Sequence, residues 1–154
     1  MKIHKLIEPE NVYVDLAATG MESALSAVAE GFAPKLGLAS SSVVESLLER
    51  ENLGSTSVGD GFAIPHCKTQ GLGQIAIALA RFADQVPFDD EGRDPVRFVF
   101  VVLSPPDQPA AHLQVLSQIA RVLKRRDLRG ELLAASNADE IVQAIRHAAE
   151  SEGL

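Results

Sequence analysis

Two almost uninterrupted apolar runs, residues 75–82 and 96–103, limit the possible folds of this chain more than any other feature. A strand that lacks alternating polar residues is buried on both faces, so a sheet built from such strands must be covered on each side. Segments with the apolar spacing of helices precede and follow these runs, and strands that alternate with helices indicate an α/β protein. The sequence therefore predicts a mixed β-sheet covered by helices on both faces, mixed because some loops between strands are short.

The remaining elements are expected from turn residues and helix-capping signals. Shorter strands are expected at 11–16 and 62–64, and loops at 52–61 and 85–95. The loop at 52–61 is rich in glycine, serine and threonine and is long for a compact domain, which suggests a functional role. Helices are expected at about 20–33, after a Thr19–Glu22 capping box; from a Ser42–Glu45 capping box to about 51; from Asp107 as N-cap to about 126; at 127–135; and after an Asn137–Glu140 capping signal.

The length and charge of the chain restrict its class and its partners. With 154 residues, it is expected to form a single domain over 1–154, with a core over about 5–150. A domain of this size is stable without a metal or disulfides. The formal net charge of −7 argues against nucleic acid as a partner, because neutralising phosphates needs a basic surface. An acidic protein is better suited to a basic protein partner.

Three features indicate a cytoplasmic location without membrane insertion. Cys67 is the single cysteine, so no internal disulfide is possible, which is typical of a reducing compartment. No apolar run approaches the roughly 20 residues that a membrane-spanning helix needs. The start of the chain carries Lys2 and Lys5 but then Glu8 and Glu10, a pattern unlike that of a signal peptide.

The segment Gly61–Lys68, in which three apolar residues run into Pro65 and then His66, is the first candidate for a site. Proline has no backbone donor, so a strand should stop there or lie at a sheet edge, and His66 would stand where the strand leaves the sheet. Strand ends often carry the chemistry of open α/β folds, and neutral histidine is a nucleophile at cellular pH. The alternative is a surface histidine in a turn.

Other side chains favour the functional interpretation of His66. His112 falls in the first turn of a helix, on its apolar side, where free N–H groups favour an anion; alone, it fits a hydrogen-bonded core histidine as well. Arg50 ends a helix just before the glycine-rich loop, and its guanidinium could bind two phosphoryl oxygens or be only an exposed charge. Ser55 and Thr56 in that loop could donate to the same anion, although turns commonly contain such residues.

Other chemistries fit the pattern less well. His66 and Cys67 are neighbours on an extended segment and point to opposite sides, which disfavours a cysteine nucleophile with a histidine base. The histidines do not show the ligand spacing of roughly three to five residues that is typical of zinc sites. No metal and no cofactor is expected, because Arg50, His112 and backbone or hydroxyl donors can stabilise the charge of a phosphoryl group.

Taken together, these motifs resemble the enzyme IIA domain of the bacterial phosphoenolpyruvate-dependent phosphotransferase system, in its fructose/mannitol/nitrogen-regulatory class. The resemblance covers about residues 5–150. One departure is Cys67, where many relatives have glycine. The matching motifs are Arg50-Glu51, Gly54-Ser55-Thr56, Gly61-Phe62-Ala63-Ile64-Pro65-His66, and His112-Leu113 at the start of a His-Leu-x-x-Leu-Ser-x-Ile-Ala-like helix.

The resemblance implies an α/β sandwich with a mixed sheet and a phosphocarrier function. His66 would accept a phosphoryl group from the phosphocarrier protein HPr through its Nε2 atom, and His112 and Arg50 would support the transfer. The phosphoryl group would then pass to a IIB partner or act on His66 as a nitrogen-type regulatory switch. The alternatives are a purely regulatory protein-binding module controlled by phosphorylation, and a small hydrolase with a histidine pair, which would need bound metal.

Overall fold

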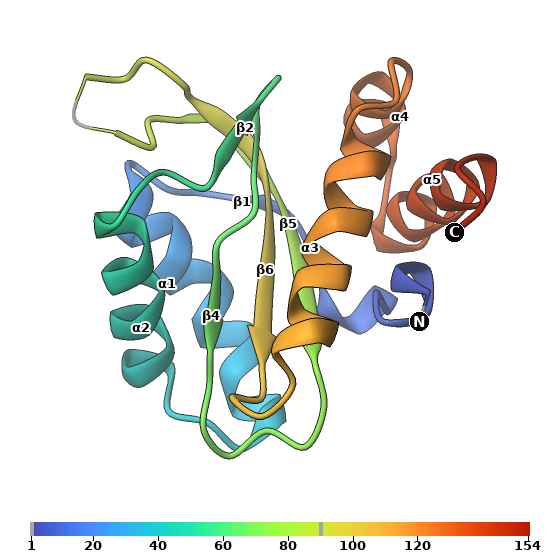
Figure 1. Ribbon diagram of the computed structural model, residues 1–154. Coiled ribbons are helices and arrows are strands. Elements are labelled where there is room, and N and C mark those ends of the chain that lie inside the picture. Colours follow the sequence, from blue (N-terminus) through green and yellow to red (C-terminus); the bar gives the residue numbers. More distant parts are fainter. Residues whose placement is uncertain (1, 90) are drawn as a thin grey trace.

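The computed structural model describes residues 2–89 and 91–154 of the chain. A mixed sheet forms the middle layer, and helices cover both of its faces (Figure 1). One face carries α1 (Met21–Phe32) and α2 (Ser40–Asn52), and the other carries α3 (Pro109–Leu123), α4 (Leu128–Ala134) and α5 (Ala138–Ser151). The expected α/β fold, with a mixed sheet between helices on both faces, is confirmed.

The two apolar runs form the centre of the sheet. They are β5 (Ala76–Val86) and β6 (Val96–Ser104), which pair antiparallel, and β1 (Val12–Leu16) pairs in parallel with the other edge of β5. Successive residues of β5 face opposite layers: Leu79 packs into the core beneath α3 and α5, and Ala80 packs into the core beneath α1 and α2. Both faces are therefore buried, which explains the lack of polar alternation in these strands.

A strand interrupted at Ile64 and Pro65 carries the candidate segment along the free edge of β6. Its two parts, β3 (Phe62–Ala63) and β4 (His66–Lys68), both pair with β6 in parallel and in one continuous register. As expected for a proline, β3 ends before Pro65 and the segment lies at a sheet edge, but pairing resumes at once in β4, so the expectation that His66 stands where the strand leaves the sheet was wrong. The Pro65 carbonyl oxygen accepts a hydrogen bond from the N–H of Val102 at 2.9 Å, so the missing proline donor does not stop the pairing. His66 consequently lies within the sheet.

The expected loop at 52–61 contains a strand of its own. β2 (Ser57–Gly59) pairs antiparallel with β3, and the two strands are joined through Asp60 and Gly61. Both of these residues have positive φ, 56° and 84°, which is the backbone conformation of the tight hairpin turns that favour aspartate and glycine. The hairpin was missed because β2 is short and partly exposed, so its sequence lacks an apolar signal.

The N-terminus of α1 is capped by a different interaction from the one expected. The helix begins after Gly20, and Ser23 Oγ accepts hydrogen bonds from the N–H of Thr19 at 2.9 Å and of Gly20 at 3.1 Å. The Thr19–Glu22 capping box was therefore wrong by one position. Serine can serve from within the first turn as an acceptor for the orphan donors of the preceding residues.

Two other capping expectations were also wrong, and one is confirmed. Ser42 lies inside α2, and α3 follows Gln108 rather than Asp107. Before α5, Asn137 Oδ1 accepts from the N–H of Glu140 at 2.9 Å, as expected. Single 3₁₀ turns are η1 (Ile3–Lys5), η2 (Pro9–Asn11) and η3 (Ala33–Leu36).

The connection between the central strands is shorter than expected, because β5 continues to Val86 instead of ending at 82. Residue 90 of the expected loop at 85–95 lies outside the described residues. Within residues 2–89 and 91–154, every helix is too short or too polar to cross a membrane.

Candidate functional site

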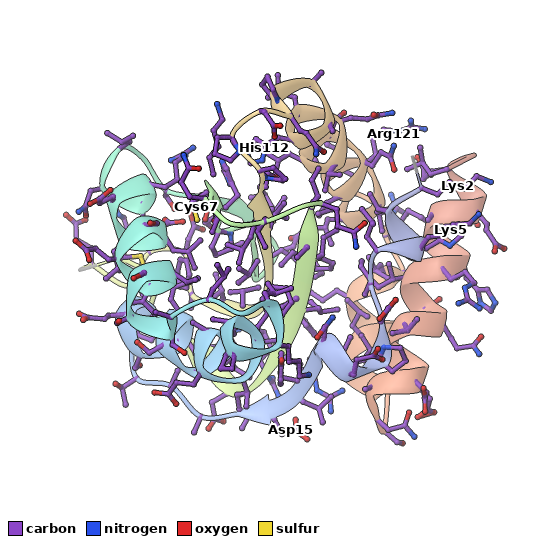
Figure 2. The ribbon with its side chains drawn as sticks, turned by 90° about the horizontal axis from the view of Figure 1, so that it is seen from below. Lys2, Lys5, Asp15, Cys67, His112 and Arg121 are labelled. Atoms are coloured by element: carbon purple, nitrogen blue, oxygen red, sulfur yellow. The ribbon has the colours of Figure 1, made fainter. Side chains whose placement is uncertain are left out.

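Three of the predicted site residues line one cavity of about 410 Å³ between α2, β4 and α3. Arg50 comes from the last turn of α2, His66 and Lys68 from β4, and His112 from the first turn of α3. Figure 2 shows His112 beside Cys67, the chain neighbour of His66, on the side of the molecule between α2 and α3. The fold thus joins segments that are far apart in the sequence at one end of β6.

His66 is held by a hydrogen bond to its own backbone. Its Nδ1 atom lies 2.7 Å from the carbonyl oxygen of Ile64, two residues earlier. Because a carbonyl oxygen only accepts, Nδ1 carries the proton and donates it. In the neutral ring, Nε2 then keeps its lone pair, which makes it the nitrogen that can attack an electrophile in the cavity.

His112 forms the opposite wall of the cavity. Its ring centroid lies 5.4 Å from that of His66, and the two ring planes are tilted by 53°. Its Nδ1 atom lies 2.6 Å from Oγ of Ser104, the last residue of β6, which is completely buried. His112 is thus a buried, hydrogen-bonded histidine, as the core alternative required, and it also lines the site.

The environment of His112 favours its neutral form. Burial lowers the pKa of His112, because a charged imidazolium is poorly solvated there. Protonation of His66 and the positive charge of Lys68 lower the pKa of His112 further, in that order. At neutral pH the ring is therefore uncharged, and it can offer one nitrogen to the cavity while Ser104 holds the other.

Arg50 brings a permanent positive charge to the cavity. Its Nη1 atom donates to the carbonyl oxygen of Gly54 at 2.9 Å, which fastens the guanidinium across the turn that follows α2. In the described part of the chain, Arg50 has no ion pair, so its charge is available to a bound anion. The exposed Lys68 supplies a second cation on the same cavity.

Ser55 and Thr56, the expected phosphoryl donors, do not line this cavity. Ser55 is exposed, and its Oγ accepts from the N–H of Ser57 at 3.1 Å. Thr56 is buried, and both its N–H and its hydroxyl donate to the carboxylate of Glu51. Glu51 was missed as a partner; the sequence signal was an acidic residue in the last turn of the helix, followed by a threonine at the end of the glycine-containing turn.

The Glu51–Thr56 pair is connected to His66 through the backbone. The carbonyl oxygen of Thr56 accepts from the N–H of Ile64 at 3.0 Å, and the carbonyl oxygen of Ile64 accepts from His66 Nδ1. The peptide unit of Ile64 is therefore held on one side by the turn and holds the imidazole on the other. Thr56 acts on His66 through this peptide and not by direct contact.

Cys67 has an environment that opposes a nucleophilic role. It packs among the side chains beneath α1 and α2, and its Sγ lies 3.5 Å from Oγ1 of Thr69. Burial raises the pKa of the Cys67 thiol, and the Thr69 hydrogen bond offsets only part of this effect. Over residues 2–89 and 91–154, His, Cys, Asp and Glu side chains form no group of three that could hold a metal ion.

The arrangement suits transfer of a group that carries negative charge. A half-buried imidazole with a free lone pair stands beside a neutral histidine, an unpaired guanidinium and a lysine. Positive charge and hydrogen-bond donors around a nucleophile stabilise the oxygens of a phosphoryl group while it is transferred.

Comparison with known proteins identifies the family of the chain over nearly its whole length. Residues 5–148 match the family model described as "Phosphoenolpyruvate-dependent sugar phosphotransferase system, EIIA 2". A nitrogen regulatory protein of Bradyrhizobium diazoefficiens is 36% identical over 145 residues, which cover 94% of this chain and 95% of that protein.

Solved structures share the fold. The crystal structure of the nitrogen regulatory protein IIA-Ntr from Neisseria meningitidis superposes with a TM-score of 0.86 at 29% identity, covering 93% of this chain and 98% of that one. Enzyme IIA of the mannitol system of Escherichia coli, solved in complex with phosphorylated enzyme IIB, has a TM-score of 0.76 at 22% identity, with 92% and 99% of the chains covered.

Proposed function

This chain belongs to the EIIA 2 family of the phosphoenolpyruvate-dependent sugar phosphotransferase system, and from this premise we propose that His66 is its phosphoryl acceptor. The phosphoryl donor would be an HPr-like phosphocarrier protein. The observation that carries the proposal is the 2.7 Å hydrogen bond from His66 Nδ1 to Ile64, which leaves the Nε2 lone pair for the cavity. A family role in phosphoryl transfer and a nucleophile with this geometry support each other.

The step exchanges one phosphorus–nitrogen bond for another. The lone pair of His66 Nε2 forms a bond to phosphorus while the bond from phosphorus to the donor histidine breaks, and its electron pair returns to the donor ring. His66 keeps its Nδ1 proton, and the Ile64 carbonyl accommodates the positive charge that the ring gains. The two bonds are alike, so the reaction is readily reversible and depends mainly on positioning.

Arg50 and His112 would stabilise the phosphoryl oxygens during this exchange. Both line the cavity with His66, Arg50 as a charge and His112 as a neutral hydrogen-bonding group. Lys68 would assist as a more mobile cation at the rim. With these three side chains on the phosphoryl oxygens, no hydrogen bond from Ser55 or Thr56 is needed. The Oγ of Ser55 accepts from Ser57, and the hydroxyl of Thr56 donates to Glu51.

Two fates are open to the phosphoryl group after His66. Transfer to a IIB partner is supported by the common fold with the mannitol enzyme IIA that was solved with phosphorylated enzyme IIB. A regulatory role, in which phosphorylated and free forms bind a target protein differently, is favoured by full-length similarity to nitrogen regulatory proteins. Both fates start from the same phosphohistidine.

The nucleophile can be tested by incubating the chain with phosphoenolpyruvate, enzyme I and HPr, followed by intact-mass analysis. The native chain should gain one acid-labile phosphoryl group, and His66→Ala should gain none. His147→Ala is the matched control, because His147 is exposed on α5 and away from the cavity. A phosphorylated His66→Ala chain would show that another residue is the acceptor.

The fate of the group can be tested next with candidate IIB proteins. Rapid loss of label from the phosphorylated chain to a IIB protein would indicate a carrier in sugar transport. Label that is stable to IIB proteins, together with partner binding that changes on phosphorylation, would indicate the regulatory module.

A further inference from the structure

The buried hydrogen bond between Ser104 and His112 lies directly behind the cavity. Ser104 ends β6 and is 0% exposed, while His112 begins the helix that follows and is 8% exposed. Their side chains meet at 2.6 Å between Oγ and Nδ1. Because water has little access to either atom, the direction of this bond determines which nitrogen of His112 carries its proton.

The surroundings of Ser104 decide that direction. In the described part of the chain, His112 Nδ1 is the one hydrogen-bonding partner of Ser104 Oγ. If Nδ1–H donated to the serine, the hydroxyl hydrogen would remain buried without an acceptor, which is unfavourable. If the hydroxyl donates to Nδ1, both groups are satisfied. The neutral ring of His112 then carries its proton on Nε2.

The two site histidines are thus held in opposite tautomers. His66 donates from Nδ1 to a carbonyl oxygen that can only accept, so its Nε2 has the lone pair. His112 accepts at Nδ1 from a hydroxyl, so its Nε2 has the hydrogen. One ring is suited to attack phosphorus and the other is suited to donate a hydrogen bond to an oxygen on phosphorus, although both are uncharged imidazoles.

We propose that Ser104 is a positioning residue, which holds His112 as the Nε2–H tautomer so that His112 donates a hydrogen bond to the phosphoryl group transferred to His66. The proposal rests on the proposed phosphocarrier function. In the transfer, the bond to His66 Nε2 forms as the bond to the donor nitrogen breaks, and neither His112 nor Ser104 gains or loses a proton. The hydrogen bond from His112 strengthens as negative charge collects on the phosphoryl oxygens.

The neutral state of His112 supports this role. A charged imidazolium would carry hydrogen on both nitrogens, and its Nδ1–H would then compete with the Ser104 hydroxyl hydrogen in a buried space. Burial lowers the pKa of His112, and protonation of His66 and the charge of Lys68 lower it further, so the neutral ring is the one that Ser104 encounters at neutral pH. A neutral imidazole can carry its proton on either nitrogen, so the Ser104 hydroxyl has a role in fixing the position of that proton; a charged ring would have no such choice.

The first test is nitrogen-15 NMR of the histidine rings in the unphosphorylated protein. The native chain should show His112 protonated on Nε2 and His66 protonated on Nδ1. Ser104→Ala should lose the single Nε2–H form of His112 and leave the His66 signals in place, whereas Ser104→Thr, which keeps the hydroxyl, should retain it. A native His112 protonated on Nδ1 would overturn the proposal, whether or not His66 is the phosphoryl acceptor.

The second test measures the rate of phosphoryl transfer from phosphorylated HPr. Ser104→Ala should slow transfer roughly tenfold with little change in the HPr concentration dependence. Without the serine hydroxyl, His112 no longer carries its proton only on Nε2, so its hydrogen bond to the phosphoryl group forms in only part of the molecules. Ser117→Ala is the matched control, because Ser117 is exposed on the same helix as His112. A native rate in the folded Ser104→Ala protein would contradict the proposed role.

A pair of His112 variants tests the same idea without altering Ser104. Glutamine places an amide N–H near the original Nε2, and asparagine places one near Nδ1, so His112→Gln should transfer faster than His112→Asn. Equal rates would overturn the donor role of Nε2. If instead the native chain takes no label on His66 at all, the proposed function fails, while the NMR result still decides the role of Ser104 in selecting the tautomer.

Discussion

His66 and His112 face one cavity from two regions of the molecule that position them by different means. In the α2–β4 region, residues 40–68, the nucleophile is held by a backbone carbonyl, that of Ile64. In the β6–α3 region, residues 96–123, the second histidine is held by a side chain, that of Ser104. A backbone acceptor survives any substitution at its own position that preserves the strand, whereas a hydroxyl is lost in a single change. His66, the proposed phosphoryl acceptor, is therefore the more robustly positioned of the two histidines.

The two regions also differ in the charge of the side chains that they bring to the cavity. The α2–β4 region contributes Arg50 and Lys68, two cations of the cavity, together with the ring of His66. The β6–α3 region contributes a ring, that of His112, whose pKa is lowered mainly by burial and further by protonation of His66 and by the charge of Lys68. An incoming phosphoryl group would thus be attracted by one side and oriented by the other. Changes on the first side should affect transfer more than changes on the second.

The largest effect is expected from Arg50→Ala. Removing the guanidinium should slow phosphoryl transfer to His66 by roughly 100-fold, because a preorganised charge near the phosphoryl oxygens is lost. Arg50→Lys should recover part of the rate, since it keeps the charge but not the planar fork. Rapid-quench measurements with labelled HPr provide the check, with Arg146→Ala on the exposed face of α5 as control. A rate within twofold of native would show that Arg50 is not used.

A smaller effect is expected from Thr56→Val, which keeps the shape of the side chain but removes the hydroxyl that donates to Glu51. The buried carboxylate loses a donor, so the free energy of unfolding should fall by about 1–3 kcal/mol, as measured by denaturant titration. Thr56→Ser should restore most of the stability. Ser55→Ala should change neither stability nor transfer; slow transfer in Ser55→Ala would revive the expected direct contact with the phosphoryl group.

The pH dependence of stability tests the β6–α3 region. The pKa of His112 is lowered on folding, so the unfolded chain binds a proton at this ring more readily than the folded one. The stability that neutral His112 contributes is present above its unfolded pKa of about 6.5 and is lost as the pH falls through the lower folded value. Compared with His112→Gln, the native chain should lose more unfolding free energy on acidification. Parallel curves for the two proteins would contradict the lowered pKa.

A small effect on phosphoryl transfer is expected from Cys67→Ala. The thiol is buried and its pKa is raised, so it is neutral at physiological pH and makes one weak contact with Thr69. Phosphoryl transfer should stay within about twofold of the native rate, and the thiol should react slowly with an aromatic disulfide reagent until the chain is unfolded. A large loss of transfer in a stable Cys67→Ala protein would mean that the β4 backbone depends on this side chain.

The parts of the site that lie in compact motifs could be predicted, and those that depend on side-chain direction could not. Arg50, His66 and His112 were identified because each lies in a motif or at a helix end whose chemistry is unusual for that location. Thr56 was placed in the right motif but given the wrong contact, because its hydroxyl turns inward to Glu51. Ser104 gave no signal: a serine at the end of an apolar strand commonly begins a loop.

The errors in the fold have a similar origin. The strand is interrupted at Pro65 as expected, but His66 was expected to leave the sheet there, whereas the Pro65 carbonyl accepts from Val102 and pairing resumes at His66. The capping boxes at Thr19 and Ser42 were misplaced, because α1 starts one residue later, with Ser23 as the acceptor, and α2 already starts at Ser40. Asn137 was correct because its interaction with Glu140 is local.

The amino-acid order alone was enough to indicate the α/β class, the mixed sheet, the family and three residues that line one cavity, since apolar periodicity and short motifs are local properties of a chain. Folding was required to reveal which hydroxyl meets which ring, and hence that two chemically identical imidazoles are held with their protons on different nitrogens. Such selection depends on partners that come together only when β6, α3 and the turn after α2 pack around one cavity, because hydrogen bonds act over about 3 Å whatever the separation along the chain.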